Sequence, residues 1–456
     1  MRLAKKIVPL LTLGIVNIGF AQTELTLPFM ENIQQSTYVN PTALPDHKVS
    51  IGLPVISSTY VDFTNTGFTY KGLKNDQTMK YDPYKAMAQM DETNNYINIG
   101  FKTDLLSFRV KARDWYFMFN ATEDINTKWT YPKDLFAFIL NGNGAKDVYD
   151  FSTLGFNASH IREYGLGITK DSKNFTFGGR FKLLQGLANV YSTSKNMRIT
   201  TDNSGMGQMS ASADGILYTS GSLDNFDAVS YANNWNNKGA AIDLGLTYKM
   251  SDKWHFTVSM LNVGFIDWKT DVRKYSIKGQ ADFAGADVFG PYVNGESFKI
   301  SEVLDSLKKA FVLTDEKVPS YRTWQIPQFY GLVKYNLTKH TSFGASYQIE
   351  KFQIPRSAFT IFANQKVGRF LSGVITYSYK FQTASNLGLG LVFKPGPFDI
   401  YFVGDNMLVP AVQYIANGFY VKNNMVDNLK SINFRVGMNL VFGRIKHAEK
   451  QSYWGL

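Results

Sequence analysis

Apolar and polar residues alternate along most of this 456-residue chain, and this alternation limits its possible folds more than any other feature. In the segment 431–442, every second residue from Ile432 to Phe442 is apolar, whereas most of the residues between them are polar or glycine. Successive side chains of a β-strand point to opposite faces, so this pattern predicts strands with one apolar and one polar face. Similar stretches occur over residues 242–250, 371–381 and 387–393.

Two architectures contain such strands, a half-buried sheet in a soluble sandwich and the wall of a transmembrane barrel. Tyrosine and glycine occur on both faces of many of these strands, which favours the barrel. The chain is 15% aromatic and only 19% charged, and this composition argues against disorder. We therefore expect a folded all-β protein.

The spacing of short polar turns predicts the number of strands. With one strand at each end, six hairpins give about fourteen, an even number that closes a barrel without an edge. The turns lie within 112–114, 171–173, 251–253, 338–340, 363–369 and 395–397. The predicted strands are 49–55, 97–111, 115–121, 161–169, 174–183, 240–250, 254–265, 329–337, 341–350, 357–362, 370–381, 386–394, 398–404 and 431–442.

Long segments separate these hairpins, and they fall on the side opposite the tight turns. Short turns at one end and long loops at the other are typical of outer-membrane barrels. Two of the long segments have apolar residues at helical spacing, 132–140 and 301–311, and each predicts a short helix in an external loop. The fold class is therefore a transmembrane antiparallel β-barrel of about 14 strands over residues 47–442.

The N-terminus has the features of a secretory signal peptide over residues 1–21. Arg2, Lys5 and Lys6 precede the apolar run Ile7–Phe20, and small residues precede a cleavage site after Ala21. Removal of this segment takes away three of the positive charges in the net charge of +11. The remaining basic residues are dispersed, so we expect no nucleic-acid partner. The signal peptide and the barrel together predict the outer membrane of a Gram-negative cell.

Two features of the termini of the predicted strands support this location. Aromatic residues flank the short turns, as in the girdles of membrane barrels. In the last strand, Arg435, Gly437, Leu440 and Phe442 resemble the C-terminal β-signal, which implies the barrel-assembly machinery as a partner during biogenesis. The basic segment 443–456 follows as a predicted periplasmic tail.

The chain resembles the outer-membrane long-chain fatty-acid transporters, which are fourteen-stranded barrels with an N-terminal hatch in the lumen. Residues Asn40, Pro41, Thr42 and Ala43 resemble their Asn-Pro-Ala hatch motif, with Thr42 in place of the alanine, and imply a hatch over residues 22–46. A closer resemblance is to an uncharacterised family of Bacteroidetes outer-membrane barrels. It is carried by the stretches 131–136, 141–144 and 163–167.

The sequence contains no pattern typical of catalysis. Without cysteine there is no thiolate zinc site and no cysteine nucleophile. The five histidines are scattered, with no helical pair and no carboxylate cluster nearby. We therefore expect no enzyme, no metal site and no cofactor.

Basic residues on the predicted lumen face are the remaining candidate ligand residues. They are Arg109, Arg180, Lys249, Lys334, Lys380 and Arg435. One hypothesis is that they attract an anionic headgroup. The alternative, which we favour, is that cations of this face are solvated or paired with the hatch acids Glu24, Glu31 and Asp46.

Two functions are consistent with these observations. The first is passive uptake of a small hydrophobic or amphipathic solute, as the resemblance implies. The second is a non-transporting barrel that serves as a structural or accessory partner of other outer-membrane proteins. Outer-membrane lipids are expected partners in both cases. An apolar pocket beside the hatch would favour uptake, whereas a packed lumen and a large apolar patch on the loops would favour the partner role.

Overall fold

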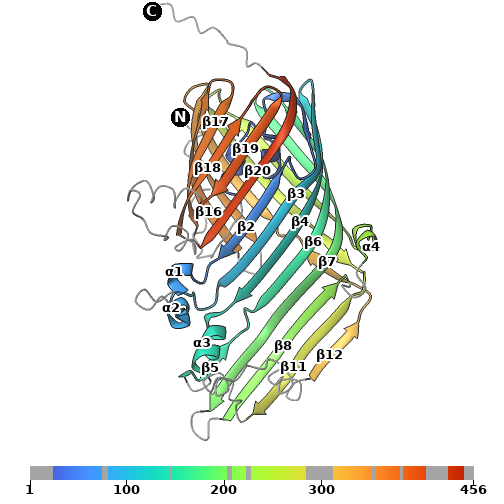
Figure 1. The fold of residues 1–456 in the computed structure, drawn as a ribbon, viewed down its shortest axis with the longest axis vertical. Coiled ribbons are helices and arrows are strands. Elements are labelled where there is room, and N and C mark those ends of the chain that lie inside the picture. The colour runs from blue at the N-terminus through green and yellow to red at the C-terminus, as the bar shows by residue number, and fades with distance from the viewer. Residues whose placement is uncertain are drawn as a thin grey trace, which may run out of the picture.

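Antiparallel strands form one continuous sheet that closes on itself (Figure 1). The last strand pairs with the first two, and this pairing makes the sheet a barrel. Closure leaves no unpaired edge in the wall. The computed structural model describes residues 24–73, 81–142, 145–202, 208–221, 227–283, 312–351, 355–380, 384–406 and 430–445.

Fourteen positions make up the wall within these described residues, which confirms the predicted barrel of about fourteen strands. Two positions are each shared by two short strands, β1 (His47–Gly52) with β2 (Thr59–Asn65), and β13 (Tyr321–Trp324) with β14 (Gln328–Asn336). The other twelve are β3 (Asn95–Ala112), β4 (Trp115–Tyr131), β6 (Gly155–Asp171), β7 (Phe175–Asp202), β9 (Lys238–Lys249), β10 (Trp254–Trp268), β15 (Thr341–Lys351), β16 (Pro355–Val367), β17 (Leu371–Lys380), β18 (Ala384–Phe393), β19 (Phe398–Asp405) and β20 (Ser431–Arg444).

All six predicted hairpins are present, and their tight connections lie at one end of the barrel. We call this end, at the top of Figure 1, the turn end, and the opposite end the loop end. Exposed aromatic side chains mark the turn end, and neighbouring strands bring some of them together. The ring centroids of Phe175 and Tyr248 are 5.1 Å apart, and those of Trp254 and Tyr335 are 4.8 Å apart. This arrangement agrees with the aromatic girdle expected at the turns.

Several strands extend further toward the loop end than the sequence predicted. The segments 122–131 and 184–202 were expected to be loops, whereas they continue β4 and β7. The predicted turn 363–369 is also too long, because β16 continues to Val367 and the chain reverses after it at Gly368, with a φ of 61°. In these extensions apolar residues no longer occur at every second position. Strands that leave the lipid no longer need an apolar face, so the alternation ends before the strand does.

The first strand is also different from its prediction, because it is interrupted between β1 and β2. Residues 53–58 leave the ladder, and β20 passes them with only two residues between its pairings to Gly52 and Thr59. Pro54 has no backbone N–H to donate, and Val55 has a φ of 64°. The predicted strand 49–55 was therefore wrong beyond residue 52.

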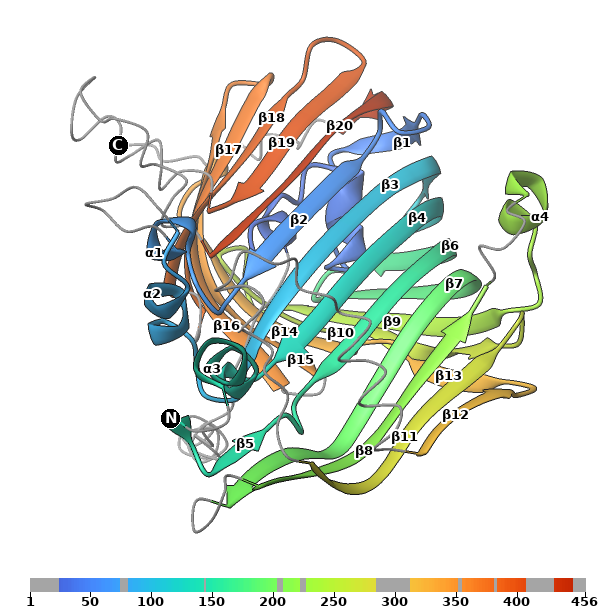
Figure 2. The same ribbon diagram turned by 60° about the horizontal axis from the view of Figure 1, so that its bottom comes forward.

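An extension of the same sheet, which we call the distal sheet, continues from the outer half of β7 at the loop end (Figure 2). β8 pairs with β7, β11 with β8, and β12 with β11, while the short β5 pairs with the tip of β7. The sequence predicted loops in this region. The additional strands are β5 (Val148–Asp150), β8 (Gln208–Ser220), β11 (Arg273–Phe283) and β12 (Val312–Lys317).

The described helices are short, and none is long and apolar enough to cross a bilayer. The predicted helix at 132–140 is confirmed as α3 (Lys133–Asn141), which begins after Pro132. The predicted helix at 301–311 lies outside the described residues. The others are α1 (Tyr70–Leu73), α2 (Pro83–Ala88) and α4 (Ala228–Ala232), with the 3₁₀ turns η3 (Leu27–Phe29) and η4 (Gln34–Tyr38) near the N-terminus.

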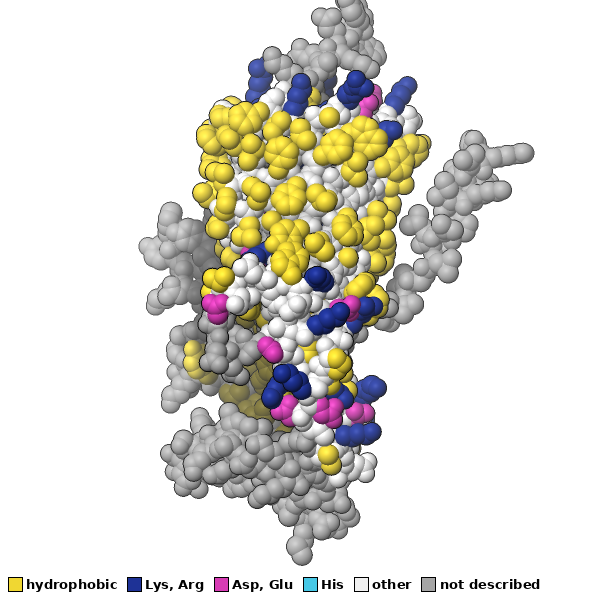
Figure 3. All heavy atoms as spheres, turned by 90° about the vertical axis from the view of Figure 1, so that its right-hand side faces the viewer, with side chains coloured by type: hydrophobic (Ala, Val, Ile, Leu, Met, Phe, Trp, Pro, Cys, Tyr) yellow, Lys and Arg dark blue, Asp and Glu magenta, His cyan; other side chains and the backbone are white. Residues whose placement is uncertain are grey.

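On the face shown in Figure 3, an apolar belt lies next to the turn end, between charged side chains at that end and others nearer the loop end. Outward residues of many strands form the belt, among them Phe177, Leu244 and Ile375, whose exposed fractions are 44–54%. A soluble protein would bury so many large apolar side chains. The belt is the surface that a membrane barrel presents to lipid.

Replacing Leu244 with arginine tests this assignment. With a rise of about 3.3 Å per residue and the usual tilt, Leu244 lies about 12 Å from the turn end, near the middle of an apolar band about 25 Å tall. We expect the free energy of unfolding in lipid vesicles to fall by about 2–4 kcal/mol, measured by urea titration. The control Val312→Arg, in β12 of the distal sheet, should change it by no more than about 0.5 kcal/mol. Equal losses would contradict the belt.

Candidate functional site

The N-terminal segment, residues 24–46, packs against the inner face of the wall (Figure 2). Most of its side chains are buried, and they bond to strands from all around the barrel. Gln35 and Asn439 exchange hydrogen bonds of 3.0 and 2.8 Å, and Tyr38 donates to Asp104 at 2.8 Å. Oγ1 of Thr26 donates to Asp405 at 2.5 Å. Polar groups of the wall therefore hold the segment in one position.

An apolar cluster supports one side of the segment. Leu27, Phe29, Met30 and Ile33 pack against inward side chains that include Phe362. The rings of Phe29 and Phe362 are stacked with centroids 4.1 Å apart. This cluster makes the inner face of β14 and β16–β19 apolar where the segment covers it, although a lumen face is usually polar.

Three ion pairs join acids of the segment to cations of the wall. Glu24 accepts from Arg435 at 2.6 Å, and Asp46 accepts from Lys394 at 2.5 Å. Glu31 pairs with Lys334 at 2.5 Å. All three acids named in the sequence analysis are thus paired with lumen cations, as the second interpretation expected.

The residues of the predicted hatch motif lie in a tightly bonded turn. Oδ1 of Asn40 accepts from the backbone N of Thr42 at 3.1 Å and from its Oγ1 at 2.7 Å. The same Oγ1 lies 2.6 Å from Oγ1 of Thr247 in β9. The carbonyl oxygens of Pro41 and Ala43 accept from Thr169 and Arg109 at 2.9 and 3.1 Å. Threonine in place of alanine therefore adds a bond between the turn and the wall.

A glycine in the wall lets this turn approach closely. Gly178 in β7 lies against Pro41, and a Cβ atom at this position would come within 2.1 Å of the Pro41 carbonyl oxygen. Any side chain at position 178 would therefore displace the turn.

Buried charges form a second layer of the lumen. Asp243 is fully buried and accepts from Arg180 at 2.9 Å and from the backbone N of Asn262 at 2.7 Å. It also pairs with Lys182 at 2.8 Å. A β-bulge in β10, where Asn262 has a φ of 58°, turns that backbone N–H toward Asp243. Glu163 completes the group at 3.0 Å from Arg180.

A cavity of about 190 Å³ lies beyond the N-terminal segment, with Glu24, Tyr38 and Val39 in its lining. Amide and hydroxyl side chains of β3, β4 and β6 supply much of the rest. Its lining has equal numbers of basic and acidic side chains, so its formal charge is balanced. They are Lys102, Lys128, Arg180, Lys182 and Arg435 with Glu24, Asp62, Asp124, Glu163 and Glu350.

A second cavity is apolar and lies at the loop end. Its volume is about 390 Å³, and it lies between the outer ends of β4 and β6 and the distal sheet. Trp129, Phe156, Met197, Leu217 and Ile277 are among its lining residues. An aromatic and aliphatic lining of this kind suits the apolar part of a small molecule.

The structure separates the predicted lumen residues into groups. Arg180 and Arg435 line the polar cavity, whereas Lys334 contacts the N-terminal segment at Glu31, and Arg109 contacts it at Ala43. Lys249 pairs with Asp171 near the turn end. Lys380 ends β17, and its side chain lies outside the described part.

The β-signal residues lie in β20, where Arg435 is buried and Phe442 is 47% exposed. Gly437 lies against the carbonyl oxygen of Ser57 in the interrupted first strand. Residues 446–456 of the predicted tail and the whole predicted signal peptide lie outside the described residues. Recognition of this strand by the assembly machinery remains a prediction.

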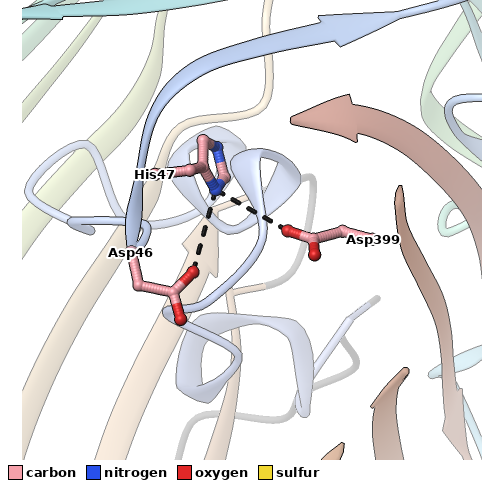
Figure 4. Close-up of side chains that lie close together, drawn as sticks. All are labelled: Asp46, His47 and Asp399. Carbon is pink, nitrogen blue, oxygen red and sulfur yellow. Dashed lines mark ion pairs between the residues drawn. The ribbon is translucent and has the colours of Figure 1, made fainter. Parts of the chain in front are cut away.

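The sequence analysis missed one cluster of ionisable residues. The expectation that no histidine has a carboxylate cluster nearby was wrong for His47. Nδ1 of His47 lies 3.8 Å from Asp46 and 3.6 Å from Asp399 (Figure 4). His160 lies 3.0 Å from Glu123. The Asp46-His47 dipeptide was a visible signal, but the approach of Asp399 depends on closure of the barrel.

A family model matches residues 41–405, which is most of the chain, and its description is family of unknown function (DUF5723). The chain belongs to DUF5723. The match begins within the Asn40–Ala43 turn and ends at the last residue of β19. It agrees with the resemblance to an uncharacterised barrel family. Among curated proteins, none matches this DUF5723 chain.

Several solved structures are similar to this DUF5723 barrel. The deltaS2 mutant of the TodX monoaromatic hydrocarbon channel is 10% identical, with a TM-score of 0.47 over 90% of this chain and 95% of that one. The Ralstonia pickettii toluene transporter TbuX is 10% identical, with a TM-score of 0.42 over 94% and 96%. A Pseudomonas aeruginosa FadL homologue has the same identity and TM-score over 94% and 100%.

Proposed function

We propose that this protein is an outer-membrane channel for passive uptake of small amphipathic solutes, with the N-terminal segment as its plug. The observation that carries the proposal is a lumen that holds a bonded N-terminal segment and contains a polar cavity beyond it. The pocket beside the N-terminal segment was expected to be apolar, whereas the cavity there is polar and the apolar cavity lies at the loop end. The belt and the closed sheet support the outer membrane as its location.

The two cavities suggest the chemistry of the solute. The polar cavity has balanced charge and many amide and hydroxyl groups, which favours a neutral polar head over an anion. Arg180 and Arg435 are both engaged by acids, so neither presents an unopposed positive charge to a carboxylate. The apolar cavity at the loop end would receive the other part of the molecule. An amphipathic solute uses both environments.

The plug is held mainly by exchangeable polar contacts, which suits a movable element. Water that enters the lumen as the segment moves can replace its hydrogen bonds and solvate the charges that it leaves. The apolar cluster around Phe29 lies on one side only and would serve as the fixed part. Diffusion supplies the driving force, and rearrangement of the polar side opens the path.

A pair of tryptophan substitutions tests uptake. Asn126 lines the polar cavity, whereas its neighbour Ile125 in β4 points outward and is 42% exposed. We expect Asn126→Trp to reduce the entry of a fluorescent medium-chain amphiphile into proteoliposomes severalfold, because the indole fills the cavity. Ile125→Trp should leave the flux unchanged, since its ring points away from the lumen. No flux through the wild-type barrel, or equal flux through both variants, would refute the channel.

The alternative, a partner in a larger outer-membrane assembly, is favoured by one observation. The distal sheet extends the wall beyond the belt and offers a broad surface at the loop end (Figure 2). Purification from native membranes distinguishes the two functions. A stoichiometric protein partner without bound amphiphile would support the assembly role, whereas bound amphiphile identified by mass spectrometry would support uptake.

A further inference from the structure

Three ionisable side chains meet where the N-terminal segment joins the wall (Figure 4). Asp46 ends the segment, His47 begins β1, and Asp399 lies in β19 beside the turn end. Nδ1 of His47 is 3.8 Å from Oδ1 of Asp46 and 3.6 Å from Oδ2 of Asp399. The side chains of His47 and Asp399 are 1% and 0% exposed, so water hardly reaches the space between them.

The atoms that face one another here have no hydrogen-bond partner among the described residues. They are Oδ1 of Asp46, Nδ1 of His47 and Oδ2 of Asp399. Nε2 of His47 also lacks a hydrogen-bond partner among the described residues. Distances of 3.6 and 3.8 Å are too long for hydrogen bonds between these groups. Buried polar atoms are nearly always paired, and one bridging group could pair all three of these atoms.

A proton on the imidazole does not supply that bridge. An imidazolium donates from both ring nitrogens, and in this geometry neither nitrogen of His47 has an acceptor within hydrogen-bonding distance. A metal ion bound at Nδ1 would instead satisfy three atoms together and leave a single N–H at Nε2. The arrangement therefore favours a cation with ligands over a protonated histidine.

We propose that Asp46, His47 and Asp399 bind a divalent transition-metal ion of the zinc type. Bonds of about 2.0–2.2 Å in a tetrahedral site place ligand atoms about 3.4 Å apart. The separations of 3.6 and 3.8 Å from Nδ1 of His47 need only a small contraction, and all three ligand atoms lie within 4.8 Å of one another. One imidazole nitrogen and two carboxylate oxygens suit zinc. Calcium, by contrast, takes about six to eight oxygen ligands.

Neighbouring cations orient both carboxylates for this role. Nζ of Lys394 donates to the other oxygen of Asp46 at 2.5 Å, and Nη2 of Arg444 donates to the other oxygen of Asp399 at 2.7 Å. Such outer partners fix the direction of a metal-binding carboxylate. Their charge also offsets that of the acids, which favours an exchangeable ion. A bound ion would tie the end of the N-terminal segment to both β1 and β19.

Metal titration of the full-length barrel in detergent, after treatment with a chelator, tests the proposal. By calorimetry we expect one equivalent of Zn²⁺ to bind the wild type. With Co²⁺ we expect the intense visible absorption of a four-coordinate site, a measurement that needs no variant. His47→Gln and Asp399→Asn should each weaken Zn²⁺ binding by at least about tenfold.

His160→Gln is the matched control, because His160 also lies beside a carboxylate but has partners on both ring nitrogens. It should bind Zn²⁺ as the wild type does, and heat-modifiable electrophoretic mobility verifies the folding of each variant. A wild-type barrel without stoichiometric Zn²⁺ binding, or unchanged binding by folded His47→Gln, would overturn the site. Transport is not measured in these titrations, so their failure is separate from failure of the proposed function.

Discussion

Asp243→Asn is expected to lower the free energy of unfolding by about 3–5 kcal/mol, among the largest losses that one substitution in this barrel can cause. Asp243 is fully buried and pairs with both Arg180 and Lys182. Removal of its charge leaves two buried cations with Glu163 as their remaining acid in this group. Uncompensated buried charge is expensive because its lost hydration is no longer offset. Urea unfolding in lipid vesicles measures the loss.

Asp267→Asn is the matched control for this prediction. Asp267 pairs with Arg322 at 2.6 Å, yet the side chains of this pair are 30% and 46% exposed. Water solvates both charges after the substitution, so the expected loss is at most about 1 kcal/mol. Similar losses in the two variants would show that burial does not set the strength of the Asp243 group.

Deletion of residues 24–45 is expected to convert the barrel into an open pore. The deletion removes Glu24 and Glu31, the apolar cluster around Phe29 and the floor of the polar cavity, but keeps the start of β1. Water entering the lumen can hydrate Arg435 and Lys334, so the wall should still fold. In planar bilayers we expect a steady channel current where the intact barrel conducts little.

Glu31→Gln is the control for the deletion, since it breaks one ion pair but leaves the segment bonded to Asp104, Asp405 and Asn439. It should conduct little, as the intact barrel does. A closed bilayer recording from the folded deletion variant would mean that other residues close the lumen. The role of the N-terminal segment as the plug would then be wrong.

The wall of the barrel could be predicted from local patterns in the chain. Period-two alternation reports which face of each strand meets lipid, and short polar turns such as 251–253 report where each hairpin reverses. Both patterns involve only a few neighbouring residues, so they can be recognised without information on distant contacts. The outer half of β7 lacks them because it leaves the lipid, and its partner β8 was missed for the same reason.

The candidate site was predicted only in part. Cations such as Lys334 and Arg435 could be placed on the lumen face from strand parity, and the pairing of Glu24, Glu31 and Asp46 with lumen cations was one of two interpretations. Which acid meets which cation depends on the path of the N-terminal segment. That path depends on close contacts such as Pro41 against Gly178. The periodicity of the sequence does not predict such contacts.

By itself the sequence determined that this protein is a closed barrel with an apolar outer face, because alternation and turn spacing are local properties of a strand. Only the tertiary structure decided what the lumen contains. Closure of β20 onto β1 and β2 brings the first and last strands together, and with them Asp46, His47 and Asp399. Contacts between residues so far apart in the sequence depend on the register of every strand between them. No short segment of the sequence determines that register by itself.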